Sequence, residues 1–390
     1  MIKMQKKQFA ALLIAVVAVS SLLTFGGLYL YADSADRTVV SKDKYEQMEK
    51  ISDRYAKLYI IQERINSDFL WETDPDEQME VLYKSLLASL DDEYSIYMDK
   101  DEYAKWTSYI QGQFTGIGVV FTQNENNEFE ITELIKDGPA EAAGLMAGDI
   151  ISSVDGKIYE TSDEMRDAMR GKEGTSVKLT YLRNGKEKEA DIVRAVVEEE
   201  SVYGKILDNN LGYIRISSFE KNTAEQFKTE LSAMENKGVG GVVIDLRNNP
   251  GGLMEAGIDI ADMLLPECTI THTEDRKGEK KYYNSDEKCT KLKYVLLVNE
   301  NTASSSEIIA AAVKDNKGGQ VAGTKTYGKG IIQTTMELTD HTAVKLTTMQ
   351  YFSPANKKIH KAGVTPDVIV ELPANAKTDI QLEKALELLQ

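Results

Sequence analysis

The sequence has few of the residues that many catalytic and structural sites need. Its 390 residues include only two cysteines and three histidines. So few cysteines exclude a zinc-finger array, a multi-cysteine cluster and a disulfide-scaffolded minidomain. A reaction that needs a histidine base has only His272, His341 and His360 to draw on.

Positive charge is also scarce relative to negative charge. The chain carries 46 Lys and Arg residues against 63 Asp and Glu residues, which gives a formal net charge of −17. Because a basic footprint is missing, we do not expect nucleic acid as a partner. The length allows about two or three domains with ample cores.

One long uncharged run, Phe9–Ala32, lies near the start of the chain and follows three lysines. A bilayer core needs about 20 apolar residues, so this run is long enough to span a membrane. Lysines before it predict a cytoplasmic N-terminus over residues 1–8 and a single-pass anchor over 9–31 in the cell membrane. The bulk of the chain would then lie outside the cytoplasm. A signal peptide cleaved near Ala32–Ser34 is the alternative.

Residues 33–112 read as a polar linker followed by helices. Apolar residues recur at every third or fourth position over Ile51–Ile65, and Asp74-Pro75 opens a second helix. Neither pattern holds a catalytic constellation. We expect these helices to serve mainly in packing, with self-association into a homodimer as the other role.

The remaining chain divides by its sequence pattern into a small domain and a larger one. Residues 113–198 combine glycine-rich turns with short alternating strands, whereas buried strands alternate with helices over 199–390. The strand candidates of the larger region are residues 212–217, 241–247, 294–299 and 343–352, and its helix candidates are 224–235, 254–264 and 307–314. A final helix follows, with Thr378 as the N-cap and Gln381 completing a capping box.

Cys268 and Cys289 flank a charged segment that reads as an exposed hairpin with a turn at Lys277-Gly278. Pairing across that turn would place both cysteines near the base of the hairpin. A disulfide and two free thiols are both consistent with this pattern.

Three segments of the larger region place glycines, serines and a lysine at the ends of strands. Asp245–Gly252 (DLRNNPGG) ends a strand in a turn whose glycines let backbone N–H groups approach a ligand or an oxyanion. Asn301–Glu307 (NTASSSE) leads into a helix, with Ser304 and Glu307 at capping-box spacing. Gly323–Gln333 (GTKTYGKGIIQ) holds a lysine between two glycines. Each segment alone also fits a plain structural turn.

Together, and in this order, the three segments resemble those of the carboxyl-terminal processing (tail-specific) protease family. Its members carry DLRxNPGG, TASxSE and G-K-G-x-x-Q segments after a PDZ domain. The resemblance covers roughly Asp91 to the end of the chain. It implies a multidomain α+β protein, in which a crotonase/Clp-protease-like α/β core carries an inserted PDZ domain. It implies neither a metal nor an organic cofactor.

The resemblance also implies roles for individual residues. Ser304 matches the nucleophile, Lys329 the general base and Gln333 a polar residue that supports the lysine. The N–H of Ser305 and that of Gly251 or Gly252 match the oxyanion donors, although the family usually has alanine where Ser305 stands. A free lysine titrates near ~10.4 and a useful base near ~7–8, so we expect Lys329 to be desolvated.

The small domain resembles a PDZ domain on two further segments. Gly116-Ile117-Gly118-Val119 is similar to the carboxylate-binding loop, and Asp163–Met169 to the groove helix. Such a loop captures a chain-terminal carboxylate while the tail adds as a strand beside the groove. Arg170, at the end of the groove helix, is expected to contact the core and to couple peptide capture to activation.

The sequence therefore predicts a membrane-anchored extracytoplasmic serine endopeptidase that acts on proteins or peptides with exposed C-termini. One alternative is a non-catalytic PDZ adaptor whose core is only a scaffold. The other is a serine protease that uses His341 or His360 as its base.

Overall fold

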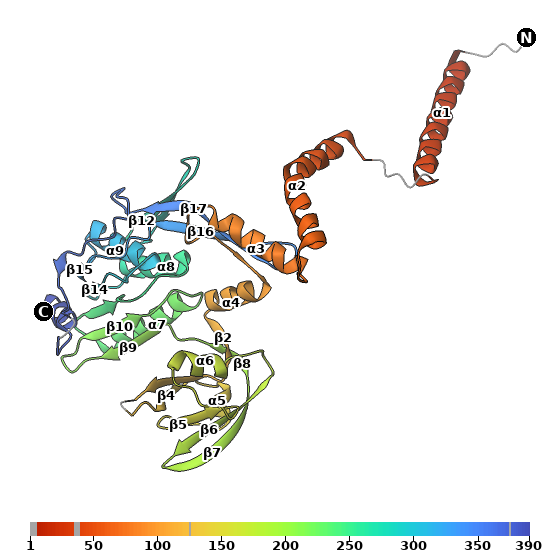
Figure 1. The fold of residues 1–390 in the computed structure, drawn as a ribbon. Helices are drawn as coiled ribbons and strands as arrows, with labels where there is room; N and C mark the ends of the chain where they lie inside the picture. The colour runs from red at the N-terminus through yellow and green to blue at the C-terminus, as the bar shows by residue number, and fades with distance from the viewer. Residues whose placement is uncertain (1–5, 35–39, 125, 374–375) are drawn as a thin grey trace, which may run out of the picture. The chain divides into compact units, whose positions relative to one another are not determined.

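The computed structural model describes residues 6–34, 40–124, 126–373 and 376–390 (Figure 1). The chain divides into two units, Met1–Met79 and Glu80–Gln390. The first unit contains α1 (Lys6–Ser34), α2 (Lys42–Asp68) and the beginning of α3 (Pro75–Ala88). The second contains all of the sheets.

Helix α1 contains the long apolar run of the sequence. Among the described residues, one helix, Lys6–Tyr31, is long and apolar enough to cross a membrane. None of its apolar window is buried within the chain. Length and composition fit either a membrane anchor or a signal sequence.

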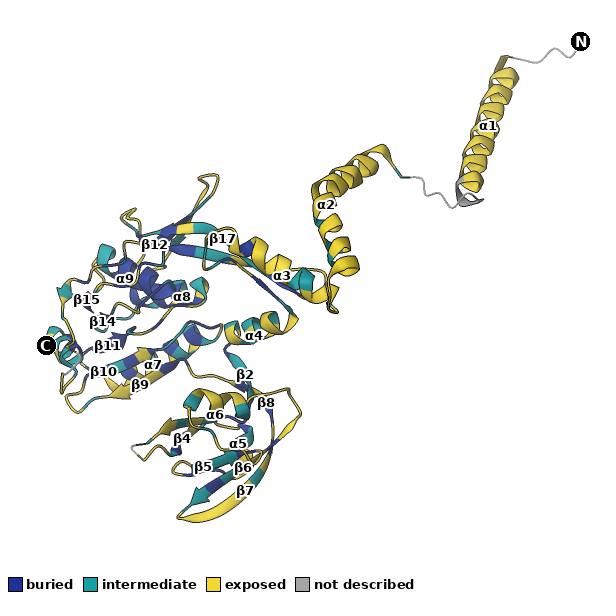
Figure 2. Cartoon of the chain, viewed as in Figure 1, coloured by how far each residue is buried: buried dark blue, intermediate teal, exposed yellow. Residues whose placement is uncertain are grey.

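Helix α2 follows the predicted helical periodicity. It begins after Ser41, whose hydroxyl accepts a hydrogen bond from the N–H of Lys44. No residue of α2 is buried, and Figure 2 shows it exposed along most of its length. The predicted homodimer remains a prediction.

The core of the second unit is built on a six-stranded sheet in the order β18-β15-β14-β11-β10-β9. Its strands are β9 (Val202–Ile206), β10 (Gly212–Ile216), β11 (Val242–Asp245), β14 (Tyr294–Val298), β15 (Gln320–Gly323) and β18 (Val368–Ile369). Neighbours are parallel except β9 and β10. Strands β11 and β14 are buried at every residue because helices cover both faces.

Helices and a second sheet complete the layers of the core. Helices α7 (Thr223–Lys237), α8 (Met254–Leu264) and α9 (Ser305–Asn316) pack on one face of the six-stranded sheet, and α10 (Ile380–Leu388) packs on the other (Figure 1). The second sheet contacts α8 and α9 through β12. These layers confirm the predicted α/β architecture.

The second sheet carries the segment of Lys329. Its strands are β1 (Ile96–Met98), β12 (Thr269–Asp275), β13 (Lys280–Asn284), β16 (Ile331–Glu337) and β17 (Ala343–Phe352). The long strand β17 pairs with β16 along one edge and with β1 and β12 along the other. Strand β1, which precedes the PDZ region, therefore pairs directly with β17, which follows the segment of Ser304.

The PDZ region forms its own sheet in the order β3-β4-β5-β6-β7. Its elements are β3 (Val119–Gln123), β4 (Phe129–Leu134), α5 (Pro139–Ala142), β5 (Ile150–Val154), α6 (Ser162–Met169), β6 (Ser176–Arg183) and β7 (Lys186–Val193). Before and after it, β2 (Gln113–Gly116) pairs with β8 (Ala195–Glu198), and α4 (Lys100–Ile110) precedes β2. Strand β3 is an edge strand, so one side of its backbone is available for pairing.

The structure decides two local predictions, the state of the two cysteines and the N-cap of α10. The predicted hairpin forms from β12 and β13, but Cys268 and Cys289 are free thiols, so the disulfide alternative is not realised. Cys268 Sγ lies 3.3 Å from Ser285 Oγ. The N-cap of α10 is Asp379, not Thr378, because its carboxylate accepts the N–H of Leu382.

Candidate active site

The segment predicted to hold the nucleophile exposes one of its three serines. Ser304 lies between β14 and α9 with φ 57° and ψ −120°, a conformation that is strained for a residue with a side chain. It is partly exposed, whereas Ser305 and Ser306 are buried. Their hydroxyls donate to the carbonyls of Gly252 (3.0 Å) and Asn249 (3.2 Å). Burial therefore separates Ser304 from two serines that local spacing alone does not distinguish from it.

The glycine turn after β11 lies directly against Ser304. A Cβ added to Gly251 would come within 2.5 Å of Ser304 Cβ, so only glycine fits there. The N–H of Gly251 donates to Asn249 Oδ1 (2.8 Å), and Asn249 is fully buried. Gly252 packs equally closely against the backbone of Phe219. The three predicted oxyanion residues thus converge beside Ser304.

An ion-pair network holds the strand end that leads into this turn. The Arg247 guanidinium contacts the carboxylates of Asp245 (2.6 Å) and Asp379 (2.8 Å) and also donates to Gln381 Oε1 (3.1 Å). Asp245 also accepts the hydroxyl of Tyr213. Several charge-assisted bonds thereby tie the beginning of α10 to the end of β11.

Glu307 joins the segment of Ser304 to the segment of Lys329. Its fully buried carboxylate accepts the N–H groups of Ser304 (2.9 Å), Gly328 (2.8 Å) and Lys329 (2.8 Å), together with the Thr326 hydroxyl (2.5 Å). Burial raises the pKa of Glu307, and these four donors oppose that shift. One side chain thus sets the spacing of two turns more than 20 residues apart in sequence.

Tyr351 makes a second bridge between the same two residues. Its hydroxyl lies within hydrogen-bonding distance of the carbonyl oxygens of Ser304 (3.0 Å) and Lys329. The ring is buried on β17, and burial raises the pKa of Tyr351 well above its ordinary value. The backbone of Ser304 and Lys329 is therefore held by the Glu307 carboxylate on α9, which accepts hydrogen bonds, and by the Tyr351 hydroxyl on β17, which donates.

Lys329 is half-buried at the turn before β16. Burial, followed by the positive charge of Lys345, lowers the pKa of Lys329, and nearby carboxylates oppose this. The predicted desolvation of the lysine is therefore present. Within the described part of the chain, no hydrogen bond joins Ser304 Oγ to Lys329 Nζ, which lies 4.5 Å from the centroid of the Tyr94 ring.

Gln333 lies on β16, close in sequence to Lys329, and its amide donates to Thr347 Oγ1 (3.1 Å). The contact anchors Gln333 to β17. Its predicted support of Lys329 remains a prediction.

The three histidines differ in their surroundings. His341 is exposed and contacts Glu337 (2.9 Å). His272 is buried between the rings of Tyr282 and Phe352. His360 lies in the segment that packs against Gly330, and burial, followed by two neighbouring lysines, lowers its pKa. Among the hydrogen bonds of the described residues, none links a histidine ring to Ser304.

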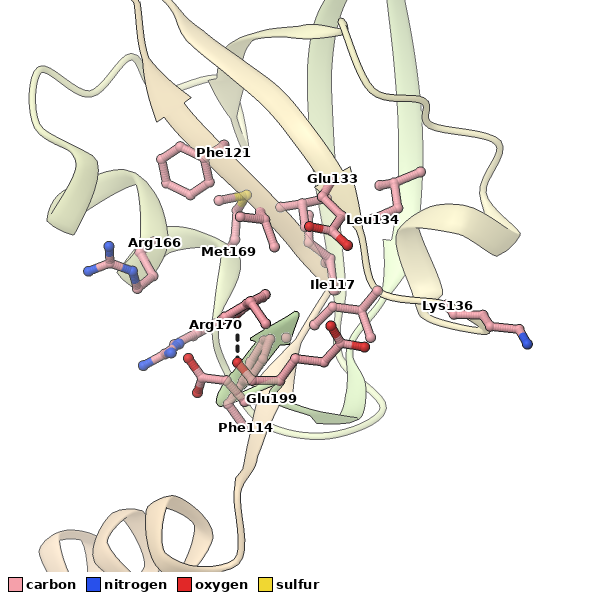
Figure 3. A pocket seen from close by; sticks show the side chains of 17 residues that line it. Phe114, Ile117, Phe121, Glu133, Leu134, Lys136, Arg166, Met169, Arg170 and Glu199 are labelled. Atoms are coloured by element: carbon pink, nitrogen blue, oxygen red, sulfur yellow. Dashed lines mark hydrogen bonds between the residues drawn. The ribbon is translucent and has the colours of Figure 1, made fainter. Parts of the chain in front are cut away.

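A pocket of about 280 Å³ opens between β3 and α6 of the PDZ region (Figure 3). The predicted loop residues Gly116, Ile117, Gly118 and Val119 all line it. Phe121, Leu134 and Met169 add apolar side chains, and Arg166 and Arg170 lie on the side of α6. The site thus offers backbone groups, an apolar floor and an open strand edge.

Arg170 lies at this pocket, where its guanidinium is 5.0 Å from the centroid of the Phe114 ring. Phe114 belongs to β2, the strand that enters the PDZ region. The predicted contact of Arg170 with the core, and the coupling that it would provide, remain predictions.

The sequence predicted the main residues of this site but not the side chains that link their segments. Ser304, Lys329 and the glycine turn were assigned from the family resemblance of their segments. Glu307 was noticed only as a helix cap, because its bridging partners Gly328 and Lys329 belong to another turn. Tyr351 and Tyr94 carry no local signal, since their roles arise from strands that are far away in sequence.

Comparisons with known proteins agree with this geometry. Peptidase family S41 matches residues 210–370, and the PDZ domain family matches residues 115–193. A probable CtpA-like serine protease of Staphylococcus haemolyticus is 34% identical over 378 residues, 95% of this chain and 74% of that protein. The carboxy-terminal processing protease CtpA of Bacillus subtilis is 35% identical over 381 residues, 96% of this chain and 79% of that protein.

A solved structure shows a similar arrangement of the chain. The photosystem II D1 C-terminal processing protease is 29% identical, with a TM-score of 0.51. The similarity covers 90% of this chain and 98% of the other.

Proposed function

The chain belongs to peptidase family S41 and is a carboxyl-terminal processing serine protease with a PDZ domain. We propose that Ser304 and Lys329 are its catalytic dyad. The observation that carries the proposal is the bridge made by Glu307, which holds the backbone N–H groups of both residues. A buried carboxylate shared in this way fixes the turns of a nucleophile and a base relative to each other.

The proposed reaction proceeds through an acyl-enzyme. Ser304 Oγ attacks a peptide carbonyl as neutral Lys329 takes its proton, and the tetrahedral intermediate collapses by breaking the C–N bond while Lys329 protonates the leaving amine. Water then attacks the ester as Lys329 takes its proton, and the second tetrahedral intermediate collapses by breaking the bond to Ser304 Oγ while Lys329 returns that proton to the departing serine. Burial supports this role because it disfavours the ammonium form of the lysine.

Backbone N–H groups are proposed to stabilise the oxyanion of the intermediate. The donors are Ser305 and either Gly251 or Gly252, all of which lie at the turn beside Ser304. The N–H of Gly251 donates to Asn249 Oδ1 in this structure, so its use as a donor requires that bond to open. Each such donor is typically worth about 2.7–4 kcal/mol in the transition state.

The PDZ pocket is proposed to capture the C-terminus of a protein or peptide substrate. The loop Gly116–Val119 would bind the terminal carboxylate, and the tail would extend β3 by one strand. The apolar lining from Ile117, Phe121 and Met169 favours an apolar terminal side chain.

Helix α1 is proposed to anchor the chain in the cell membrane, with the protease core outside the cytoplasm. Its length, its apolar composition and the lysines before it support this topology. N-terminal sequencing of the mature protein in isolated membranes tests it. An intact N-terminus supports the anchor, and a new N-terminus near Ala32 supports a cleaved signal peptide.

The dyad is tested by replacing its members in the full chain and measuring cleavage of an unfolded test substrate. Ser304→Ala is expected to lower kcat at least about a thousandfold, because the nucleophile is lost. Ser306→Ala, a matched change at a buried hydroxyl, should cost at most about tenfold. Persistent cleavage by the Ser304→Ala protein would contradict the assignment, and lack of cleavage by wild type would favour an adaptor.

The identity of the base is tested separately. Lys329→Met is expected to lower kcat by about the same factor as Ser304→Ala, since the two residues act as one unit. His341→Ala and His360→Ala should both retain cleavage. Substantial activity in the Lys329→Met protein, combined with loss of activity in a histidine variant, would instead identify a histidine base.

A further inference from the structure

An aromatic ring from the chain before the PDZ region lies on the candidate base. Lys329 Nζ is 4.5 Å from the centroid of the Tyr94 ring, well inside the range of about 6 Å over which a ring attracts a cation. Tyr94 is half-buried, so part of this attraction acts away from water. Lys329 therefore has a defined partner in this structure, and that partner is not Ser304.

The turn that carries Tyr94 is firmly built. Asp92 accepts the N–H of Tyr94 (3.2 Å) and the hydroxyl of Ser95 (2.5 Å), and Ser95 Oγ accepts the N–H of Thr347 on β17 (3.0 Å). Strand β1 begins directly afterwards and pairs Ile96 with Lys345. The ring is thus held by the same strand whose Tyr351 bonds the backbone of Lys329.

Charged and titratable groups face Lys329 from every element packed around it. Lys345 on β17 disfavours the ammonium, whereas Glu93, Asp92 and Glu307 favour it. Tyr351 contacts only its backbone carbonyl. The face of Tyr94 adds to the groups that favour the charged form, and burial opposes them.

We propose that Tyr94 is a positioning residue for the base: its ring holds the Lys329 ammonium in a resting place, which Lys329 must leave to take the proton of Ser304. This inference rests on the proposed function for the role of Lys329. The contact itself rests only on the structure. It gives the segment before the PDZ region a part in the chemistry of the core.

The first test is the pH dependence of kcat/KM for the full chain, which reports the ionisation of free-enzyme groups. The base works when neutral, so activity rises through the pKa of Lys329. Tyr94→Leu keeps apolar bulk but removes the ring. It should move this acid limb about half a pH unit lower, about a threefold gain in kcat/KM on the limb. Tyr94→Phe keeps the ring and should keep the wild-type limb.

The second test does not depend on activity. In a Ser304→Ala background, trace acetic anhydride acylates only neutral amines, and mass spectrometry follows Lys329 across a pH series. Tyr94→Leu should label Lys329 about threefold faster at a fixed pH on the rising limb, while Tyr94→Phe should match Tyr94. Lys205 on β9, which lies over the ring of Tyr213 at 5.2 Å, is the internal reference and should not change.

These outcomes separate the inference from the proposed function. Unchanged or slower labelling of Lys329 in the Tyr94→Leu protein, or an equal change in the Tyr94→Phe protein, would overturn the role of Tyr94. Faster labelling in a chain whose wild type cleaves nothing would support the contact and refute the base. Tyr94→Met provides a second ringless variant, and thermal unfolding checks that each protein is folded.

Discussion

The region around Ser304 and the PDZ groove solve different physical problems. In the core, Glu307 and Tyr351 fix the backbone of two turns through buried hydrogen bonds. In the PDZ region, an edge strand and long side chains such as Arg166 border an open pocket. Proton transfer needs atoms fixed to fractions of an ångström, whereas capture of varied tails needs an unpaired strand edge and adaptable walls.

Among the changes that test this comparison, Glu307→Gln is expected to have the largest effect on kcat and stability. An amide keeps the shape of the side chain but replaces one acceptor oxygen with a donor, so two buried N–H or O–H groups lose their partner. Each orphaned group costs about 1–3 kcal/mol, and a small displacement of the turns can lower kcat about a hundredfold. Urea unfolding and single-turnover cleavage measure the two effects. The exposed change Glu225→Gln is the control, and a kcat within threefold of wild type would show that the bridge is dispensable.

Tyr351→Phe tests the second bridge with a smaller change. It removes only the hydroxyl that the carbonyls of Ser304 and Lys329 share. We expect a loss of about 1–2 kcal/mol in the free energy of unfolding and a fall of about tenfold in kcat. Tyr282→Phe, at an exposed ring, should change neither quantity. Loss of stability without loss of kcat would mean that the hydroxyl only supports folding.

Gly118→Ala tests substrate capture by the PDZ groove. Gly118 has φ +77° in the predicted carboxylate loop, where a Cβ strains the backbone by about 1 kcal/mol. We expect KM to rise about fivefold with kcat unchanged, because capture is weakened and the chemistry is intact. Gly185→Ala is a matched control, since Gly185 has φ +72° at a turn outside the pocket. A fall in kcat instead would show that the groove also orders the core.

The smallest effect is expected from Lys345→Gln. The positive charge of Lys345 helps to lower the pKa of Lys329, so its removal should raise that pKa. A smaller fraction of Lys329 is then neutral, and the acid limb of kcat/KM moves to higher pH by about half a unit. The pH profile of Lys186→Gln, at an exposed lysine on β7 of the PDZ region, should overlay that of wild type. A limb that moves to lower pH would contradict the assigned sign.

Much of the fold could be read from the sequence because its signals are local. Helix α8 and strand β17 have the predicted bounds, since helical periodicity and runs of strand-forming residues are properties of short segments. The α10 cap was misplaced by one residue. Thr378 and Asp379 both have side chains that are favoured at an N-cap. In the structure Asp379 is the cap, and its carboxylate also forms a long-range ion pair with Arg247.

The candidate site divides in the same way. Ser304, Lys329, the glycine turn and the PDZ loop were assigned from the family resemblance, which rests on short segments of the sequence. Local spacing alone did not distinguish Ser304 from its two neighbours, which differ from it in burial. The role of Glu307 as a bridge was not available either, because its partners Gly328 and Lys329 come from another turn.

The sequence by itself determined the order of the parts, the residue types of the proposed dyad and the scarcity of histidine that favours a lysine base. The tertiary structure alone decided how the three serines differ in burial, what holds the two turns together and where the lysine rests. The physical reason is that composition and periodicity act over a few residues. Burial, desolvation and shared hydrogen bonds arise only when segments distant in sequence pack together, as Glu307, Tyr351 and Tyr94 do around Lys329.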